Sequence, residues 1–319
     1  MNTTPSPNLI LLVGAGNMAT EYAKILKALK KPLVVVGRSE KSAANFEQVT
    51  GMSVVRGGLK IWFKKNAGPA PSTAIVAVDE EQLGLTTRLL ISRGIKTILL
   101  EKPGGLNVAD LKKTQKLAKE KECKIFIAYN RRFYASTLKA QEYIKKDGGV
   151  TSFNFDFTER SDRIETAPFS AKVKKEWLLA NSSHVIDLAF FLGGKPEKIN
   201  SRIAGSLNWH PRASIYVGAG ISISKALFSY HANWESAGRW SVEIMTPKRK
   251  LIFRPLEKLQ MQKMGSMVVE EVRIDDKLDA KFKSGLYRLT QSFLTTQKDL
   301  PTVDEQMENL RYYELINGR

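Results

Sequence analysis

The 319-residue sequence predicts an α/β protein with two domains: an N-terminal parallel sheet with flanking helices, and a C-terminal α/β domain with an open, largely antiparallel sheet. The length favours two domains, because a single core rarely grows beyond roughly 250–300 residues. Up to residue 128, short apolar runs alternate with helical patterns, which is typical of βαβ units. Beyond residue 129, extended runs follow one another with few helical patterns between them, which favours an antiparallel sheet.

The N-terminal part contains apolar runs with the length of buried strands, at residues 9–13, 33–36, 73–78, 97–100 and 124–128. Apolar side chains at helical spacing follow the first run: Met18, Tyr22, Ile25 and Leu29. Another helix is expected near residues 80–92, and Asn107 is expected to cap the helix after that. The stretch beyond the second strand is less regular, and we interpret residues 53–56 and 61–63 as short strands or turns.

The C-terminal part contains period-two runs at residues 152–157, 199–208, 214–234, 240–246, 250–253 and 267–274. One helix is expected before these runs, near residues 136–146, and a single helix interrupts them over residues 177–192. We therefore expect a first domain over residues 1–128 and a second over residues 129–301. A closing helix over residues 302–317 is expected to pack back onto the first domain.

A glycine-rich turn, residues 14–19 with the pattern G-x-G-x-x-A, stands between the first strand and the first helix. Gly14 permits a tight turn and Gly16 lets the backbone approach a pyrophosphate, which then meets the positive end of the helix. In this strand–turn–helix context the motif predicts a Rossmann fold that binds a dinucleotide, with Asn17 and Met18 also at the cofactor. The alternative is a purely structural turn.

The end of the second strand bears on the choice of nicotinamide cofactor. NAD-specific folds usually offer an acidic residue there to bind the ribose 2′-hydroxyl. This sequence has Arg38, Ser39 and Lys41, and its first acidic residue is Glu40. A guanidinium and a hydroxyl suit a 2′-phosphate, so NADP is favoured over NAD. Alternatively, Arg38 stacks on the adenine.

The end of the fifth strand carries Glu101 and Lys102, at the sheet edge where the cofactor is expected. Burial beside a nicotinamide cation would loosen the proton of Lys102, which could then act as an acid or base. The alternative for Lys102 is an exposed lysine in a turn. Val78 and Asn130 lie at the ends of neighbouring strands, and we add them to the predicted cofactor site.

The histidines, His184, His210 and His231, have no metal-ligand spacing, so no metal site is predicted. His184 and Asp187 share one helical face, and on its own His184 would be interpreted as a core histidine. Neither a G-x-S-x-G nucleophile elbow nor a phosphate-binding P-loop occurs.

The formal charge of +18 suggests attraction to polyanions or to an acidic substrate. The lysines are spread along the chain without a dense basic run interleaved with aromatics, so a solvated surface is favoured and no nucleic-acid partner is expected. The single cysteine, Cys123, excludes an internal disulfide. The first apolar run is too short for a membrane span. We expect a cytoplasmic protein without membrane contact.

Taken together, these motifs give the chain a resemblance to the Gfo/Idh/MocA oxidoreductase family. The resemblance is carried by residues 14–19, Glu101-Lys102-Pro103, the Tyr129-Asn130-Arg131-Arg132-Phe133 segment, His184-x-x-Asp187 and the closing helix. It implies a Rossmann domain, an open-sheet substrate domain, and assembly into homodimers or homotetramers. It also implies that Glu101 lies near the nicotinamide ribose, that Lys102 is the acid/base or substrate-orienting residue, and that the Lys102–Pro103 bond is cis, as it often is in relatives.

One position departs from the family pattern. Relatives that oxidise sugars commonly have an aspartate four residues before the histidine, where this chain has Ala180. Asn181 is adjacent, but one helical residue corresponds to about 100° of rotation, so it need not take that place.

We expect an NAD(P)-dependent enzyme that transfers a hydride to or from a secondary alcohol or carbonyl of a sugar-like, acidic or nucleotide-linked substrate. Lys102 and His184 are the expected catalytic residues. Asn181 and Arg131 are expected at the substrate, although Arg131 and Arg132 would serve equally well in structural pairing. A catalytically silent dinucleotide sensor that acts through a protein partner is the main alternative, and Ala180 favours it. A third possibility is an enzyme that holds NAD tightly and uses transient oxidation to drive elimination or glycoside cleavage.

Overall fold

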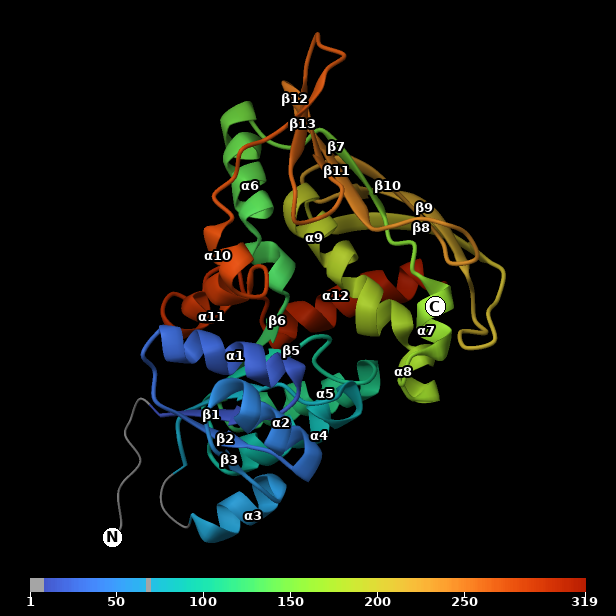
Figure 1. Cartoon of the computed structure of the whole chain (residues 1–319). Helices are drawn as coiled ribbons and strands as arrows, with labels where there is room; N and C mark the ends of the chain where they lie inside the picture. Colours follow the sequence, from blue (N-terminus) through green and yellow to red (C-terminus); the bar gives the residue numbers. More distant parts are fainter. Residues whose placement is uncertain (1–8, 67–69) are drawn as a thin grey trace. The chain divides into compact units, whose positions relative to one another are not determined.

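The structure is a computed structural model that describes residues 9–66 and 70–319. The chain divides into two compact units, which are treated separately below (Figure 1). Unit 1 comprises Met1–Tyr129 and Leu286–Met307, and unit 2 comprises Asn130–Gly285 and Glu308–Arg319. The N-terminal residues 1–8 of the expected first domain lie outside the described residues.

Unit 1 contains a six-stranded sheet in the order β3-β2-β1-β4-β5-β6, with every pair of neighbours parallel. Its strands are β1 (Ile10–Val13), β2 (Leu33–Val36), β3 (Val54–Val55), β4 (Thr73–Val76), β5 (Thr97–Glu101) and β6 (Lys124–Ala128). All four residues of β1 are buried, because helices cover both faces of a parallel sheet. This strand order is that of a Rossmann fold and confirms the predicted fold class.

The helices of unit 1 are α1 (Asn17–Ala28), α2 (Glu40–Thr50), α3 (Gly58–Lys65), α4 (Glu80–Ser92), α5 (Val108–Glu120) and α11 (Leu286–Leu294). Asn107 caps α5 as predicted, since its side chain accepts a hydrogen bond from the backbone N–H of Asp110. The interpretation of residues 61–63 as a strand or turn is wrong, because they lie within α3. There the buried side chains Leu59, Trp62 and Phe63 follow a helical period.

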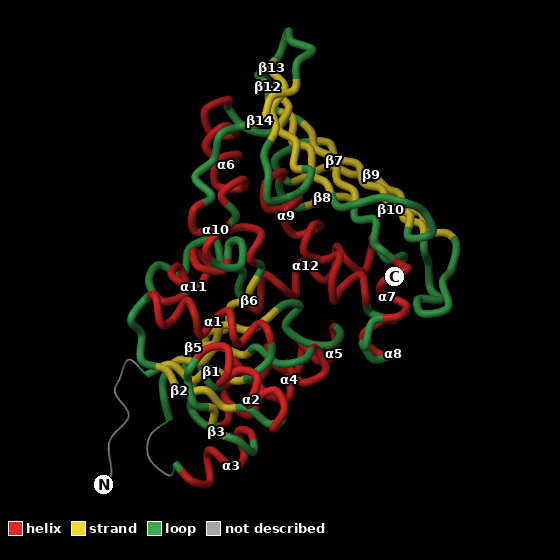
Figure 2. The backbone as a smooth tube through the Cα atoms, viewed as in Figure 1, coloured by secondary structure: helices red, strands yellow, loops and turns green. Residues whose placement is uncertain are grey.

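Unit 2 contains an eight-stranded sheet in the order β14-β13-β12-β11-β7-β10-β9-β8, drawn in yellow in Figure 2. Its strands are β7 (Ser152–Asp156), β8 (Pro196–Ala204), β9 (Ile215–Ser222), β10 (Leu227–Asn233), β11 (Ser241–Met245), β12 (Arg249–Phe253), β13 (Gln260–Lys263) and β14 (Val269–Glu271). Only the β7–β10 pair is parallel among its paired strands. The predicted open, largely antiparallel sheet is therefore confirmed.

The helices of unit 2 include η1 (Asn130–Phe133), α6 (Ala135–Asp147), α7 (Ser161–Thr166), α8 (Ala171–Lys175), η2 (Leu178–Ser182), α9 (Ser183–Gly193) and α10 (Lys277–Lys281). α9 packs against β7 and β11, where Phe153 and Phe155 point inward and Phe190 meets both rings. The single helix predicted over residues 177–192 is corrected, because its first turn is the π-helical segment η2. A wider turn of this kind is often found at functional sites.

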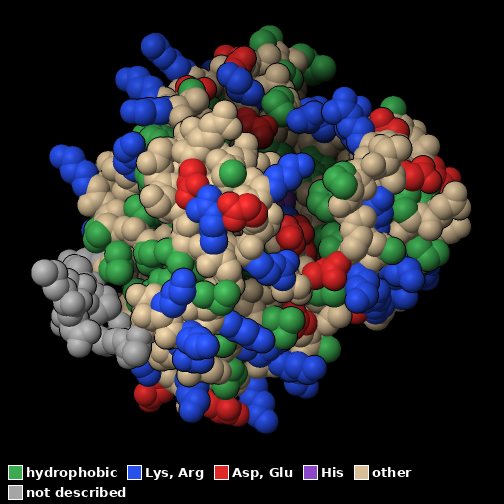
Figure 3. Space-filling view, turned by 60° about the horizontal axis from the view of Figure 1, so that its bottom comes forward, with side chains coloured by type: hydrophobic (Ala, Val, Ile, Leu, Met, Phe, Trp, Pro, Cys, Tyr) green, Lys and Arg blue, Asp and Glu red, His purple; other side chains and the backbone are tan. Residues whose placement is uncertain are grey.

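The closing helix is present as α12 (Val303–Ile316). No helix in the described ranges has both the length and the apolar character needed to cross a membrane. Lysine and arginine side chains are dispersed among acidic and neutral groups on the face drawn in Figure 3.

Candidate functional site

The glycine turn of unit 1 is built for close backbone contact. Gly14 has a φ of +120°, and a β-carbon there would collide with the carbonyl oxygen of Ala77. Backbone bonds hold the turn between neighbouring strands: Gly14 N–H donates to Val36 at 2.9 Å, and Ala77 N–H donates to Val13 at 2.8 Å. The turn therefore tolerates only glycine at this position.

The N-terminus of α1 follows this turn and is open to a ligand. Gly16 occupies the N-cap position, and a β-carbon there would have nothing within 4 Å. Asn17 is exposed, Met18 is half-buried, and no acidic side chain lies in the first turn. The first N–H groups of a helix lack intrahelical partners and carry positive potential, so this cradle fits the pyrophosphate of a dinucleotide.

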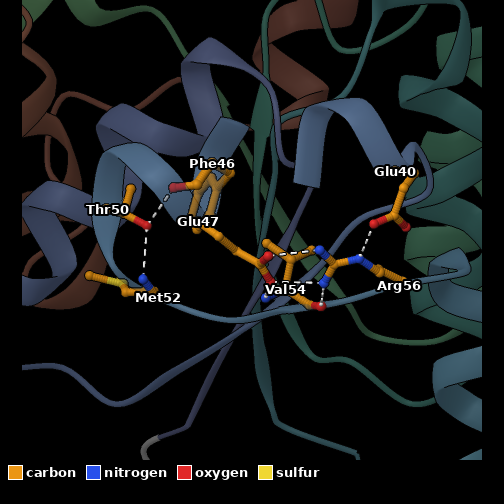
Figure 4. Close-up of polar contacts among 7 residues, drawn as sticks. All are labelled: Glu40, Phe46, Glu47, Thr50, Met52, Val54 and Arg56. Atoms are coloured by element: carbon orange, nitrogen blue, oxygen red, sulfur yellow. Dashed lines mark hydrogen bonds and ion pairs between the residues drawn. The ribbon is translucent and has the colours of Figure 1, made fainter. Parts of the chain in front are cut away.

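The end of β2 presents the predicted ribose-binding residues. Arg38 and Ser39 are both exposed, and Ser39 caps α2 by accepting a hydrogen bond from the N–H of Ser42 at 3.3 Å. The next residue, Glu40, accepts a hydrogen bond from Nε of Arg56 at 2.7 Å (Figure 4). The carboxylate nearest to Arg38 in sequence therefore already has a cationic partner.

Arg56 also binds Glu47 of α2 with two parallel hydrogen bonds, from Nη1 at 2.8 Å and Nη2 at 2.7 Å (Figure 4). These bonds, together with one from the N–H of Val54, lower the pKa of Glu47 to about 2. Arg56 thus ties α2 to β3. Its positive charge offsets the negative charges of Glu40 and Glu47, which lie on the helix that follows Arg38 and Ser39.

The end of β5 carries Glu101, which is 8% exposed, and Lys102, which is half-buried. The hydroxyl of Tyr22, on α1, donates to Oε1 of Glu101 at 2.7 Å. Burial first, and the negative charge of Glu101 second, raise the pKa of Tyr22, so its hydroxyl keeps its proton. The Lys102–Pro103 bond is cis, as the resemblance implied. Gln306 holds the following turn by donating to the carbonyl oxygen of Pro103 at 3.1 Å.

In unit 2, the short helix η1 gives its two arginines different surroundings. Arg132 makes a buried bidentate pair with Asp187 of α9, with Nε at 2.8 Å from Oδ2 and Nη2 at 2.6 Å from Oδ1. Arg131 instead lies over Trp240, with its guanidinium carbon 5.2 Å from the ring centroid. Arg132 is thus structural, whereas Arg131 faces a cavity. Asn130 is buried and donates to the carbonyl oxygen of Ser284 at 2.9 Å.

A cavity of about 450 Å³ lies within unit 2. Its lining includes the basic side chains of Arg131, Arg160, Arg163 and Arg239, the aromatic rings of Phe169, Trp177 and Trp240, and the polar groups of Thr158, Glu159, Asn181 and Glu257. Such a combination of guanidinium groups and aromatic surfaces is suited to an anionic ligand with a flat or ring-shaped body. Of the residues predicted from sequence to bind substrate, Arg131 and Asn181 line this cavity.

Glu159 is the buried carboxyl group of the cavity, at 7% exposure. Asn181 Nδ2 donates to both of its oxygens at 3.1 Å, and Ser182 Oγ donates to Oε1 at 2.7 Å. Burial raises the pKa of Glu159 to about 7, although Ser182, Asn181, Trp177 and Trp240 act in the opposite direction. A carboxyl group with such a pKa can change its charge near neutral pH.

His184 lies on α9 and is 6% exposed, with its ring centroid 6.3 Å from that of Trp240. Trp240 lines the cavity, whereas His184 lies beside it and is not among the lining residues. The predicted residues are divided between the units: Lys102 and all the cofactor candidates except Asn130 belong to unit 1, and the substrate candidates belong to unit 2. Within the described ranges, no cluster of three histidine, cysteine or acidic residues is arranged to hold a metal ion.

Sequence reasoning missed most of the cavity, including Glu159, Arg160, Arg163, Trp177, Arg239 and Trp240. The one available signal was the position of Glu159, three residues beyond the end of β7. A charged residue just beyond a strand is ordinarily solvated, so this signal is weak.

Residues 9–129 match the model of an oxidoreductase family with an NAD-binding Rossmann fold. No curated protein sequence matches the chain.

Solved structures resemble the chain over nearly its whole length. An oxidoreductase from Agrobacterium radiobacter in complex with NAD+, L-tartaric acid and magnesium has a TM-score of 0.79 at 11% identity, covering 98% of both chains. A levoglucosan dehydrogenase in complex with NADH and L-sorbose has a TM-score of 0.76 at 15% identity, covering 97% of this chain and 95% of the other. The WlbA dehydrogenase from Chromobacterium violaceum, in complex with NADH and UDP-GlcNAcA, has a TM-score of 0.73 at 14% identity, covering 100% and 95%. At these identities the likeness shows a shared fold.

Proposed function

We propose that this chain, whose residues 9–129 match the model of the Gfo/Idh/MocA oxidoreductase family, transfers a hydride between NADP and a sugar-like substrate that carries a negative charge. The reacting group is a secondary alcohol or the corresponding carbonyl. The observation that carries this proposal is the cavity of unit 2, where four arginines and three aromatic rings line a space of about 450 Å³. The similar structures with L-tartaric acid and UDP-GlcNAcA hold acidic ligands, which supports the same class for this chain.

The substrate's charge would be bound first by Arg131. Its Nη1 donates to Asn130, and its buried Nε has no hydrogen-bond partner among the described residues. A guanidinium group that is fixed by a neighbour and stacked on an aromatic ring is well prepared to bind a carboxylate or phosphate. Arg160, Arg163 and Arg239 add positive charge around it.

The bound nicotinamide would supply hydride transfer at its C4 atom, held by the glycine turn and α1. Lys102 would exchange the proton of the substrate oxygen at its Nζ atom, since it stands at the carboxyl end of a central parallel strand. Asn181 would orient the substrate from the cavity lining of unit 2, and His184, beside the lining residue Trp240, would assist it. Glu101 is kept in place by the hydrogen bond from Tyr22, in support of its predicted role at the nicotinamide ribose.

The cofactor preference rests on Arg38 and Ser39. We expect NADPH to bind more tightly than NADH. Arg38→Ala should reduce the ratio of NADPH to NADH affinity by roughly tenfold to hundredfold, because it removes a charge-assisted hydrogen bond to the 2′-phosphate. Fluorescence titration of both nucleotides measures it. Lys119→Ala, which removes one exposed cation elsewhere in unit 1, controls for net charge. Tighter binding of NADH to the unaltered protein would contradict the NADP assignment.

The activity itself is tested by following nicotinamide absorbance with a panel of sugars, sugar acids and nucleotide sugars. On the substrate that the panel identifies, Lys102→Met should lower turnover by roughly 10²–10⁴-fold while nucleotide binding changes far less. Full activity in Lys102→Met would show that another group moves the proton. No turnover on any acidic or neutral sugar, with nucleotide binding intact, would instead favour the dinucleotide sensor.

We also propose that the chain forms a homo-oligomer through the outer face of its eight-stranded sheet. Val217 on β9 and Leu227 on β10 lie on that face and are 41% and 63% exposed. Exposed apolar side chains on neighbouring strands favour burial against a partner. Light scattering of the purified protein tests this assembly. A monomer at all concentrations would contradict the proposal.

A further inference from the structure

We propose that Glu159 binds a hydroxyl group of the substrate, so that the cavity of unit 2 selects ligands which combine a negative charge with a hydroxyl. This inference depends on the proposed function only in taking the cavity as the substrate site. Glu159 lines the cavity and reaches it from the segment that follows β7, which is remote in sequence from the motifs of the family.

The hydrogen bonds of Glu159 leave one oxygen better placed for a ligand. Of the three direct hydrogen bonds to the carboxyl group, Oε1 accepts two, from Asn181 and Ser182, and Oε2 accepts one, from Asn181 at 3.1 Å. An ionised carboxylate offers about two acceptor sites on each oxygen. Oε2 therefore retains more capacity to accept a hydrogen bond, and a sugar hydroxyl is a natural donor.

The contacts that fix Glu159 come from neutral side chains. Asn181 and Ser182 donate to it, and Trp177 and Trp240 also act on its carboxyl group. A buried carboxylate without a cationic partner is costly, because its lost hydration is only partly replaced. Groups of this kind are concentrated at functional sites, where the cost is tolerated for binding or chemistry.

The location of Glu159 also bears on the family departure at position 180. Asn181 and Ser182 belong to η2, the π-helical segment that contains Ala180. Glu159 thus brings a carboxyl group to the helix segment from which the aspartate of relatives would project. The chain has alanine at residue 180, but the carboxylate of Glu159 is hydrogen-bonded to the next two residues of η2, Asn181 and Ser182.

The charge state of Glu159 adds a dependence on pH. Its pKa is raised to about 7 by burial, so it accepts a hydroxyl hydrogen bond most strongly above neutral pH. The other charged groups around the cavity are Arg131, Arg160, Arg163, Arg239 and Glu257. Arginine side chains keep their charge across this range. His184, whose ring lies 6.3 Å from that of Trp240, is controlled for below by substitution.

The test uses D-glucuronate and cyclohexanecarboxylate, which both carry one carboxylate on a six-membered ring but differ in their hydroxyl groups. Binding is followed by tryptophan fluorescence without any nucleotide, because Trp177 and Trp240 line the cavity. At about pH 8, where Glu159 is mostly ionised, we expect Glu159→Gln to weaken glucuronate binding by roughly tenfold or more. Cyclohexanecarboxylate should change by less than about twofold, since it makes no such bond.

Glu142→Gln is the matched control, because Glu142 is an exposed carboxyl group of unit 2 that does not line the cavity. It should leave the ratio of the two affinities unchanged. Equal losses for both ligands in Glu159→Gln, or no loss for either, would overturn the proposal. So would an unaltered protein that binds both ligands equally well or binds neither.

If Glu159→Gln does not fold, the unaltered protein still decides the question. The ratio of glucuronate to cyclohexanecarboxylate affinity should rise severalfold between about pH 6 and pH 8, and His184→Asn should keep that rise. A flat ratio, or a rise that disappears in His184→Asn, would overturn the assignment to Glu159. Because neither nucleotide nor turnover is involved, failure of the dehydrogenase panel would leave this result standing.

Discussion

The buried pair of Arg132 and Asp187 allows a quantitative prediction about stability. Their side chains are 6% and 1% exposed, and two short hydrogen bonds join them across two helices of unit 2. Asp187→Asn keeps the shape of the side chain but removes the carboxylate charge that binds the buried Arg132 guanidinium in a bidentate pair. Breaking one partner of a buried pair costs about 3–5 kcal/mol, a large part of the 5–15 kcal/mol that stabilises a typical domain.

Urea denaturation measures this loss. Tryptophan fluorescence follows unit 2, in which Trp209 and Trp234 are buried and stacked with their ring centroids 5.7 Å apart. The double variant Arg132→Met/Asp187→Leu should recover most of the lost stability, because a well-packed apolar pair carries no buried charge. Lys225→Gln, which breaks an exposed ion pair with Glu197, should leave unfolding unchanged. A loss below about 1 kcal/mol in Asp187→Asn would refute the reasoning, as would a double variant no more stable than Asp187→Asn.

Two further perturbations test the two units separately. Gly14→Ala should lower the melting temperature of unit 1, because the added carbon meets the fixed carbonyl of Ala77. Gly16→Ala should leave thermal unfolding unchanged but weaken NADPH binding in a fluorescence titration. Equal melting temperatures for Gly14→Ala and the unaltered protein would contradict this. The raised pKa of Glu159, from 4.5 to about 7, means that the folded state holds this proton more tightly, so its stabilising contribution is complete below pH 4.5 and is lost as pH rises to about 7. Relative to Glu159→Gln, the unaltered protein should therefore lose about 3 kcal/mol of stability across that window, and parallel curves of denaturation against pH would exclude the shift.

Much of unit 1 follows from local sequence patterns. The apolar runs became strands, Asn107 caps its helix, and the glycine turn stands between β1 and α1. Each of these depends on backbone preferences and side-chain hydrogen bonds within a few consecutive residues, which a single segment of sequence contains. The apolar triplet at residues 61–63 was misinterpreted because three consecutive apolar residues fit a strand and a helix equally well.

The chemistry of unit 2 was decided by contacts between distant segments. Arg131 and Arg132 are neighbours in sequence, yet only the packing of η1 against α9 determines that Arg132 binds Asp187, 55 residues away, while Arg131 faces the cavity. Glu159 looks like an ordinary charged residue beyond a strand until η2 supplies its hydrogen-bond donors and the surrounding rings remove it from water. Sequence determines residue type and local conformation, but burial and charge partners come from atoms that only the folded chain brings within a few ångströms, and these set the pKa of a carboxyl group.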